Sequence, residues 1–328
     1  MAGFGSEFSA KYIVAHFRNG VWETPRMLAT EAMPIHPASH VLHYASECFE
    51  GLKAYRNAAG GQHIFRLDKH IARMRNSAEQ LCLPVPETDF LEAMITTVVR
   101  ENQSDIPEFP GSLYLRPTMI GLDENIGNAG SPTQSAVLYV LTSPVGDYFT
   151  AGSKGLRLLV DDQAMRTTPN FGQVKTGGNY AMALQHIKRA KAEYQCDQVL
   201  FCPGGDVQET GAANFFLIKD KTLITKPLDG SILPGVTRDS LLSLAESIGY
   251  KTEVRDFSVE ELLSSCGEGE CALSGTAAVL TPVAELVHNG KTYSVGNGST
   301  EQTQNLRQVL LDVQSGVSEE NSDWLVKL

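Results

Sequence analysis

The chain has 328 residues, a length typical of about two domains. Its 27 lysines and arginines against 38 aspartates and glutamates give a formal net charge of -11, which argues against nonspecific nucleic-acid binding and a polybasic membrane patch. A composition of 42% hydrophobic and 20% charged residues is ordinary for a chain with a packed core and argues against disorder of the whole chain.

The N-terminus and the cysteines favour a cytoplasmic protein. No stretch approaches the roughly 20 apolar residues of a membrane helix. Residues 1–11 have no apolar core of the kind found in a signal peptide, and they include Glu7. The six cysteines form no CxxC pair, and no histidine cluster lies beside them at zinc spacing. We therefore expect six reduced thiols and no metal site.

The first half is predicted to mix strands and helices. A brief strand is expected at 62–66, followed by a helix that Asp68 caps and that runs to about Leu83. A second helix is expected over 89–101. Strands are expected over 112–120 and 136–143, and the start of the latter is continuously apolar, as in a strand buried on both faces.

Residues 143–155 are rich in turn-forming residues and are predicted to include a linker. This places a domain at 1–145, a linker at 146–155 and a second domain at 156–328. Beyond the linker we expect, in chain order, a strand at 156–160, a helix at 181–194, strands at 198–201, 214–218 and 222–225, a helix at 237–248 that stops at Gly249, and a strand at 271–273.

Two capping boxes are predicted in the second half. Ser258 with Glu261 is expected to start a short helix, and Ser299 with Gln302 a helix that ends near Gly316. Strands and helices do not alternate regularly, and the sequence has neither GxGxxG after a strand nor GxxxxGK[ST]. The nucleotide-binding folds are therefore disfavoured.

Lys175 is the only formal charge between residues 167 and 185. A helix is predicted just after it, and the positive end of that helix disfavours an ammonium nearby, as does burial among Val, Gly and Thr. Such a lysine suits a Schiff-base nucleophile or a proton carrier. A solvated lysine in a glycine-rich loop is the other interpretation of this segment.

Glu209 lies among small residues between a turn and a predicted strand, where a planar group can pack against the backbone. A carboxylate there can keep a ring nitrogen protonated, although this segment taken alone favours an ordinary acidic turn residue. Residues 233–238 lead into a helix whose first amides can bind a phosphate. Residues 274–278 form a small-residue turn suited to an anion. A plain helix start and a plain turn are the other interpretations of these two segments. Arg66 can clamp a phosphate or carboxylate, or be a surface arginine.

Together these segments resemble the branched-chain amino acid aminotransferases, which belong to the fold-type IV pyridoxal-phosphate enzymes. The resemblance extends from about Phe4 to Trp324. The matching stretches, in order, are 49–55 (FEGLKAY), 65–66 (FR) with the helix to 81–84 (LCLP), 114–117 (YLRP), 175–180 (KTGGNY), 209–214 (ETGAAN), 233–238 (LPGVTR) and 274–277 (SGTA). Each motif alone is weak, but seven in this order are specific.

The resemblance implies roles for individual residues. Lys175 would bind pyridoxal 5′-phosphate covalently and carry the proton, and Glu209 would hold the pyridine nitrogen. Tyr180 would hydrogen-bond the ring oxygen of the cofactor. The phosphate would be held by Arg66, Val236, Thr237 and Thr276. The substrate pocket would be formed by Tyr44, Phe49, Tyr114, Arg116, Tyr148, Thr276 and Ala277, with one or both of Phe4 and Phe8 reaching it.

The resemblance also implies a fold and a reaction. The fold would be α+β, with a smaller N-terminal α/β domain, a larger C-terminal pseudo-barrel domain and the cofactor between them, in a homodimer. The reaction would be a ping-pong amino transfer between leucine, isoleucine or valine and 2-oxoglutarate. Arg116 would meet the distal carboxylate of glutamate, and the amides around Thr276 and Ala277 the α-carboxylate.

Departures and alternatives remain. Ala212 stands where some members carry a threonine, and Ala278 and Thr281 replace a redox CxxC found in some relatives, so thiol regulation of that kind is not expected. The same fold serves D-amino acid aminotransferases, amine transaminases and aminodeoxychorismate lyase. A non-catalytic binding protein is a further alternative, against which Lys175 and Glu209 argue.

Overall fold

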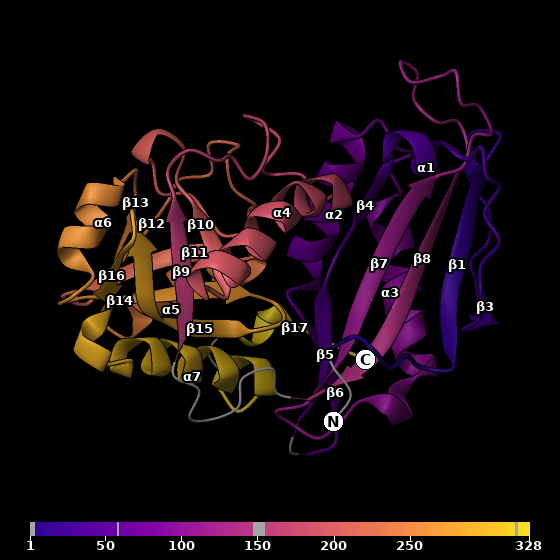
Figure 1. The fold of residues 1–328 in the computed structure, drawn as a ribbon. Helices are drawn as coiled ribbons and strands as arrows, with labels where there is room; N and C mark the ends of the chain where they lie inside the picture. Colours follow the sequence, from indigo (N-terminus) through magenta and orange to yellow (C-terminus); the bar gives the residue numbers. More distant parts are fainter. Residues whose placement is uncertain (1–3, 58, 147–154, 319–320) are drawn as a thin grey trace. The chain divides into compact units, whose positions relative to one another are not determined.

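The computed structural model describes residues 4–57, 59–146, 155–318 and 321–328. The chain forms two compact units, each with its own sheet (Figure 1). The first unit comprises residues 1–148, 174–177 and 313–328, and the second comprises 149–173 and 178–312. The expected linker falls mostly on residues 147–154, outside the described residues. No helix in the described ranges is long and apolar enough to cross a membrane.

The first unit contains an antiparallel sheet, nine-stranded within the described residues. Its strands lie in the order β17 (Leu325–Lys327), β6 (Gln62–Phe65), β5 (Leu52–Arg56), β7 (Ser112–Gly121), β8 (Ala136–Val145), β1 (Lys11–Arg18) and β2 (Val21–Trp22), with β3 (Arg26–Ala29) on β1 and β4 (Glu47–Phe49) on β7. The C-terminal β17 therefore pairs with a strand from the first quarter of the chain.

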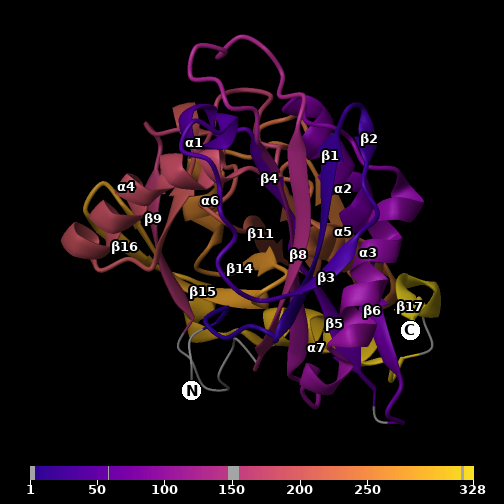
Figure 2. The same cartoon turned by 90° about the vertical axis from the view of Figure 1, so that its right-hand side faces the viewer.

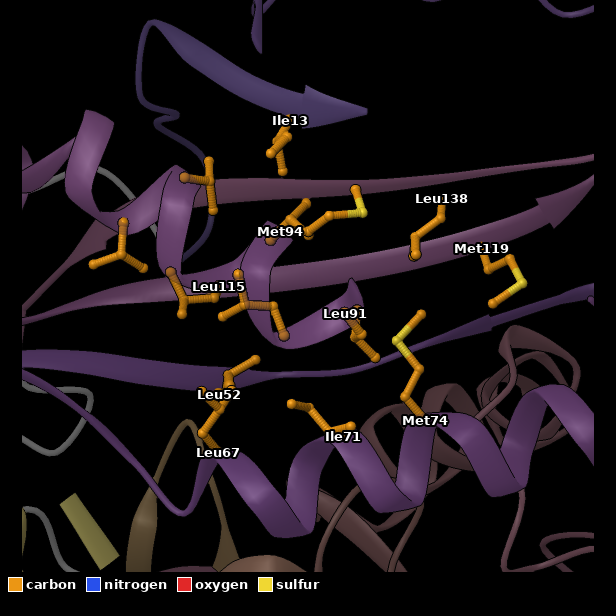
Figure 3. Packing of buried hydrophobic residues seen from close by; sticks show 14 of the residues in the cluster. Ile13, Leu52, Leu67, Ile71, Met74, Leu91, Met94, Leu115, Met119 and Leu138 are labelled. Carbon is orange, nitrogen blue, oxygen red and sulfur yellow. The ribbon is translucent and has the colours of Figure 1, made fainter. Parts of the chain in front are cut away.

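Three helices belong to this unit: α1 (His40–Tyr44), α2 (Leu67–Gln80) and α3 (Thr88–Glu101). α2 packs on β4 and α3, and α3 packs on β1 and β8 (Figure 2). Leu67, Ile71 and Met74 of α2 recur every three or four residues, so they lie on one face and fill the core with strand residues such as Leu115 and Leu138 (Figure 3).

The ends of α2 differ from the prediction. Arg66, in a left-handed conformation with φ 51°, is the N-cap residue, and Asp68 lies in the first turn of the helix, so the expected Asp68 cap is wrong. The helix ends at Gln80 instead of Leu83, because Cys82 turns the backbone to φ 52° two residues before Pro84. The carboxylate of Asp68 still favours the helix start through the helix dipole.

The second unit contains a mixed sheet, eight-stranded within the described residues. Its order is β10 (Gln198–Phe201), β9 (Leu156–Asp161), β15 (Val279–His288), β14 (Glu270–Gly275), β11 (Asn214–Lys219), β12 (Thr222–Thr225) and β13 (Lys251–Val254), with β16 (Lys291–Ser294) on β15. β9 runs parallel to β10 and β15, and β12 runs parallel to β13, whereas the other pairs are antiparallel. The expected α+β class is confirmed.

The remaining helices are α4 (Gly177–Tyr194), α5 (Val236–Ser247), α6 (Val259–Ser265) and α7 (Glu301–Ser315). α5 ends as predicted, with Gly249 just beyond it at φ 81°. Ser258 accepts a hydrogen bond from the amide of Glu261 at 3.1 Å, so the α6 cap is confirmed. Short 3₁₀ turns lie at Gln103–Asp105, Pro203–Gly205, Gly296–Gly298 and Ser322–Trp324.

The start of α7 is capped differently from the prediction. The hydroxyl of Ser299 accepts only a long hydrogen bond from the amide of Glu301, at 3.3 Å. The buried carboxylate of Glu270 in β14 accepts the amides of Gln302 and Thr303 at 3.0 and 2.8 Å. A carboxylate from the sheet thus satisfies the helix start, a long-range contact that the local Ser299–Gln302 pattern cannot indicate.

Candidate active site

Lys175 lies in a short segment that packs within the first unit. Its amide donates to the hydroxyl of Ser77 in α2 at 3.0 Å, and its carbonyl accepts from the amide of Phe49 at 3.0 Å. The side chain is half-buried, with its ammonium 5.0 Å from the centre of the Phe49 ring. Two elements that are distant in sequence, β4 and α2, therefore fix the backbone of the predicted catalytic lysine.

A pocket of about 510 Å³ opens on the first sheet. It brings together the predicted pocket residues Phe49, Tyr114 and Arg116, and both Phe4 and Phe8 line it. The remaining lining residues are Gly5, Thr118, Tyr139, Leu141, Thr142 and Ser143. Thr118, Tyr139 and Leu141 were not predicted, although the period of two along β7 and β8 indicates them, because alternate strand residues share a face.

Arg116 is the cation of this pocket. Its guanidinium donates to the Tyr114 hydroxyl at 2.8 Å and lies 4.7 Å from the centre of the Phe49 ring. Its buried Nε has no hydrogen-bond partner, and no carboxylate lies within salt-bridge distance of Arg116 among the described residues. An arginine placed between aromatic rings with donors to spare can bind a carboxylate.

The other predicted residues of this unit lie elsewhere. Arg66 is buried between β6 and α2, and its guanidinium stacks 4.1 Å from the Trp324 ring centre. The Tyr44 hydroxyl donates to the carbonyl of Ile126, and Tyr44 does not line the pocket described above. Tyr148 lies outside the described residues. The stacking of Trp324 on Arg66 was not predicted, because the two residues are 258 positions apart in the sequence.

A buried cluster of Glu50, His70 and Arg73 in the first unit was not predicted either. Glu50 accepts from Arg73 Nε at 2.6 Å and Nη2 at 2.8 Å, and from His70 Nδ1 at 2.8 Å. Burial alone would raise the pKa of Glu50, but Arg73 and His70 outweigh it and hold the pKa well below its usual value. Burial lowers the pKa of His70 despite the nearby carboxylate, so a neutral His70 donates from Nδ1.

Glu209 is the centre of the predicted residues in the second unit. It is buried, pairs with Arg166 at 2.7 Å, and accepts from Asn214 Nδ2 at 2.8 Å and from the amide of Leu233 at 2.9 Å. These donors favour the charged carboxylate. Arg166 was missed, because nothing local in the sequence marks an arginine 43 residues before its partner.

The predicted phosphate loop lies against this carboxylate. The Leu233 carbonyl accepts from Asn214 Nδ2 at 2.9 Å, and Gly235 is the N-cap residue of α5. A Cβ on Gly235 would collide with the Asn214 side chain, so glycine permits this close approach. Val236 and Thr237 are both buried in the first turn of α5, where helix amides lack intrahelical acceptors. The structure thus joins Glu209 to the loop that precedes α5.

The turn after β14 contains Thr276 and Ala277, both half-buried. Asn214 of β11 pairs with Ser274 of β14, which places this turn at the strand ends beside the Glu209 segment. The Ser274 hydroxyl is buried without a hydrogen-bond partner in the described structure. Tyr180 lies half-buried in the first turn of α4. Within this unit, the predicted residues other than Tyr180 gather where β11, β14 and α5 begin or end.

These residues fit pyridoxal 5′-phosphate by the chemistry of their donors. Lys175 offers an amine for a covalent link, and Glu209 offers a buried carboxylate for a ring nitrogen. The first turn of α5 and the unpartnered Ser274 hydroxyl offer neutral donors of the kind that bind a phosphate. Each donor type that the cofactor needs is therefore present.

Comparison with known proteins agrees with this chemistry. Residues 47–286 match the family "Amino-transferase class IV". The chain is 37% identical to the chloroplastic branched-chain-amino-acid aminotransferase 5 of Arabidopsis thaliana, over 97% of this chain and 76% of that protein. It is 35% identical to the cytosolic branched-chain-amino-acid aminotransferase of Saccharomyces cerevisiae, over 98% of this chain and 90% of that one.

A solved structure shares the fold. The T.th. branched-chain amino acid aminotransferase complexed with N-(5′-phosphopyridoxyl)-L-glutamate superimposes with a TM-score of 0.79 at 29% identity, covering 98% of this chain and 99% of that one. The expected fold-type IV architecture is thereby confirmed. The chain belongs to the class IV aminotransferases, and within them to the branched-chain amino acid aminotransferase family.

Proposed function

We propose that this chain transfers the amino group of leucine, isoleucine or valine to 2-oxoglutarate by a ping-pong mechanism, with Lys175 as the catalytic residue. The observation that carries the assignment of residues is the pocket of the first unit, where aromatic side chains and the guanidinium of Arg116 surround one space and Lys175 lies 5.0 Å from the Phe49 ring. An aromatic wall suits an aliphatic side chain, and the guanidinium suits an acidic one.

The cofactor is pyridoxal 5′-phosphate, as in the family, and when bound it supplies an electron sink for the negative charge that develops at the substrate Cα. Lys175, Tyr180 and Glu209 would hold its ring end. Arg66, Val236, Thr237 and Thr276 would hold its phosphate. An anchored phosphate keeps the ring in one orientation while the amine at the reacting carbon is exchanged.

Glu209 and Lys175 divide the proton chemistry. Glu209, held by Arg166 and two neutral donors, would keep a proton on the ring nitrogen, because a buried carboxylate stabilises the adjacent cation. Lys175 Nζ would take the proton from the substrate Cα and return it at the next carbon. Its fixed backbone limits the arc through which Nζ moves between these two positions.

One pocket must accept two kinds of side chain. Phe49 and Tyr114, which line the pocket, would contact the aliphatic side chain. The resemblance adds Tyr148 as a further wall and Tyr44 as a residue of the same pocket, whereas in this structure Tyr44 lies outside the pocket described above. Arg116 would bind the distal carboxylate of glutamate through its spare donors. The amides around Thr276 and Ala277 would take the α-carboxylate, so that both substrates share one anchor at the reacting end.

The family leaves the compartment open, because its members named above include a chloroplastic and a cytosolic enzyme. We propose a cytoplasmic protein, because its six cysteines are free thiols, and we propose a homodimer on the resemblance alone. The proposed partners are small-molecule substrates, and neither nucleic acid nor a membrane is among them.

Single half-reactions test the function. Purified holoenzyme is mixed with L-leucine, L-glutamate, D-alanine or a simple chiral amine, and the loss of the yellow absorbance of the lysine-bound cofactor is followed. We expect fast bleaching with both L-leucine and L-glutamate. Bleaching with D-alanine or the amine alone would move the activity to a sister transaminase. No bleaching with any of them would favour aminodeoxychorismate lyase or a non-catalytic binding protein.

A further inference from the structure

Glu47 is a carboxylate beside the Lys175 segment to which nothing above assigns a role. It lies in β4, two residues before Phe49, and alternate residues of a strand point to the same face. Cys48 points to the other face and is fully buried in the core of the first unit. β4 therefore presents Glu47 and Phe49 together to the segment that contains Lys175.

The contacts of Glu47 lie just after Lys175. Its Oε1 accepts a hydrogen bond from the Thr176 hydroxyl at 3.0 Å and another from the amide of Gly177. The peptide of Lys175 itself is held by Ser77 and Phe49. Hydrogen bonds to the side chain of Glu47 thus fix the two residues that follow the lysine, and the whole segment from 175 to 177 is restrained.

The position of Glu47 is energetically unfavourable for an ionised carboxylate. No lysine or arginine lies within salt-bridge distance of Glu47 in the described ranges. Burial raises the pKa of Glu47, and the hydrogen bonds from Gly177 and Thr176 and the charge of Arg116 offset that effect only in part. The fold therefore retains a half-buried carboxylate that destabilises it, which is what a functional placement produces more readily than packing does.

We propose that Glu47 is a positioning residue for Lys175. By accepting from Thr176 and Gly177, it holds the backbone that follows the lysine in one conformation and so aims the lysine side chain. The role depends on the acceptor atom and on its reach, and it requires no contact with substrate. This inference rests on the proposed function, because the reaction gives the lysine's direction its importance.

Three substitutions of Glu47 separate the effect of its side-chain length from the effect of its charge. Glu47→Gln keeps an oxygen acceptor at the same distance, Glu47→Asp keeps the charge but shortens the side chain, and Glu47→Ala removes both. We expect Glu47→Ala and Glu47→Asp to slow the first-order step of both half-reactions by roughly tenfold to a hundredfold, as a small misplacement of a reacting group does. Glu47→Gln is expected to stay within about threefold of wild type.

The apparent substrate affinities sharpen the result. A positioning role lowers the limiting rate with L-leucine and L-glutamate alike and leaves the substrate concentration for half-saturation nearly unchanged. Glu92→Ala is the matched control, because Glu92 is an exposed glutamate of the same unit. A Glu47→Ala enzyme as fast as wild type, or a Glu47→Gln enzyme as slow as Glu47→Ala, would overturn the proposal.

Hydrogen exchange of the protein without cofactor supplies a second readout. The amide of Gly177 should exchange faster in Glu47→Ala than in wild type or Glu92→Ala, and Glu47→Gln should restore its protection. Unchanged exchange in Glu47→Ala would contradict the proposal. If Glu47→Ala fails to fold, Glu47→Asp takes its place in both experiments. If the wild type reacts with neither substrate, the proposed function fails, while hydrogen exchange still decides whether Glu47 restrains this segment.

Discussion

Each unit contains a buried carboxylate–arginine pair. The two pairs agree in distance and burial, but they join different parts of the fold. Glu50 and Arg73 lie 2.6 Å apart with side chains 1% and 7% exposed, and Glu209 and Arg166 lie 2.7 Å apart with side chains 3% and 4% exposed. Both side chains that donate to Glu50, those of Arg73 and the neutral His70, come from α2. The partners of Glu209 come from three separate segments, one of which leads into α5.

The difference shows that burial and pairing do not identify a functional carboxylate. The Glu50 pair connects the end of β4 to α2, so its role is structural. The Glu209 pair gathers loops at strand and helix ends, where backbone donors are available for a ligand. The segments that a buried ion pair joins therefore indicate its function better than the length and burial of the pair do.

The largest effect is expected from Glu50→Gln. This change leaves the guanidinium of Arg73 buried without its countercharge, and breaking a buried pair in this way costs about 3–5 kcal/mol. Urea unfolding should show the loss at neutral pH, while the half-reaction rates of the folded variant stay near those of wild type. If Glu50→Gln is as stable as wild type but has low activity, the Glu50–Arg73 pair is functional and its structural assignment is wrong.

The same variant has a signature in pH. Because the fold lowers the pKa of Glu50, its ionised form stabilises the native state above the ordinary value of 4.5, and that stability is lost as the pH falls through the lowered value. The difference in unfolding free energy between wild type and Glu50→Gln should therefore shrink on acidification. A difference independent of pH would show that charge is not what Glu50 contributes.

The next effect is expected from Glu209→Gln. Loss of the carboxylate removes the charge that keeps the ring nitrogen protonated, and removal of one such electrostatic contact slows catalysis by roughly 10²- to 10³-fold. Both half-reactions should slow equally, because both use the same cofactor. Glu261→Gln, in the first turn of α6, is the matched control. If Glu209→Gln slows only the reaction of L-glutamate, Glu209 acts on the substrate and not on the ring.

Local patterns accounted for much of the fold. The helix over 237–248, its stop at Gly249 and the Ser258 cap follow from short-range rules, and the structure bears them out. The starts of α2 and α7 did not follow, because Arg66 occupies the cap position of the first and Glu270, 31 residues upstream of Glu301, caps the second. A local motif cannot compete with a buried carboxylate that tertiary structure brings to the same amides.

The residues of the candidate site likewise divide into those indicated by a local motif and those defined by long-range contacts. Lys175, Glu209 and Arg116 were predicted as site residues because motifs surround them in the sequence. Arg166 and the Glu50 cluster were missed, because their partners become neighbours only when strands and helices pack. The roles of the individual residues rest on the resemblance and on the experiments proposed above.

The smallest effect is expected from Arg116→Ala, and it concerns an arginine that differs from Arg73 and Arg166. Those two have carboxylate partners, whereas Arg116 has none within salt-bridge distance among the described residues, and its Nε lacks a hydrogen bond. Removing Arg116 therefore breaks no ion pair and loses only its longer-range attraction to Glu47, so the unfolding free energy should change little.

L-Glutamate carries the distal carboxylate that Arg116 is proposed to bind, so its half-reaction should slow when Arg116 is removed. We expect the half-reaction of L-glutamate to fall by roughly tenfold to a hundredfold in kcat/KM, the value of one or two charge-assisted hydrogen bonds. L-Leucine has no distal carboxylate and should change by less than about threefold. Arg75→Ala, an arginine of α2 that does not line this pocket, is the control. Equal losses with both amino acids would mean that Arg116 shapes the pocket through Phe49 and Tyr114, and that glutamate's distal carboxylate is recognised elsewhere.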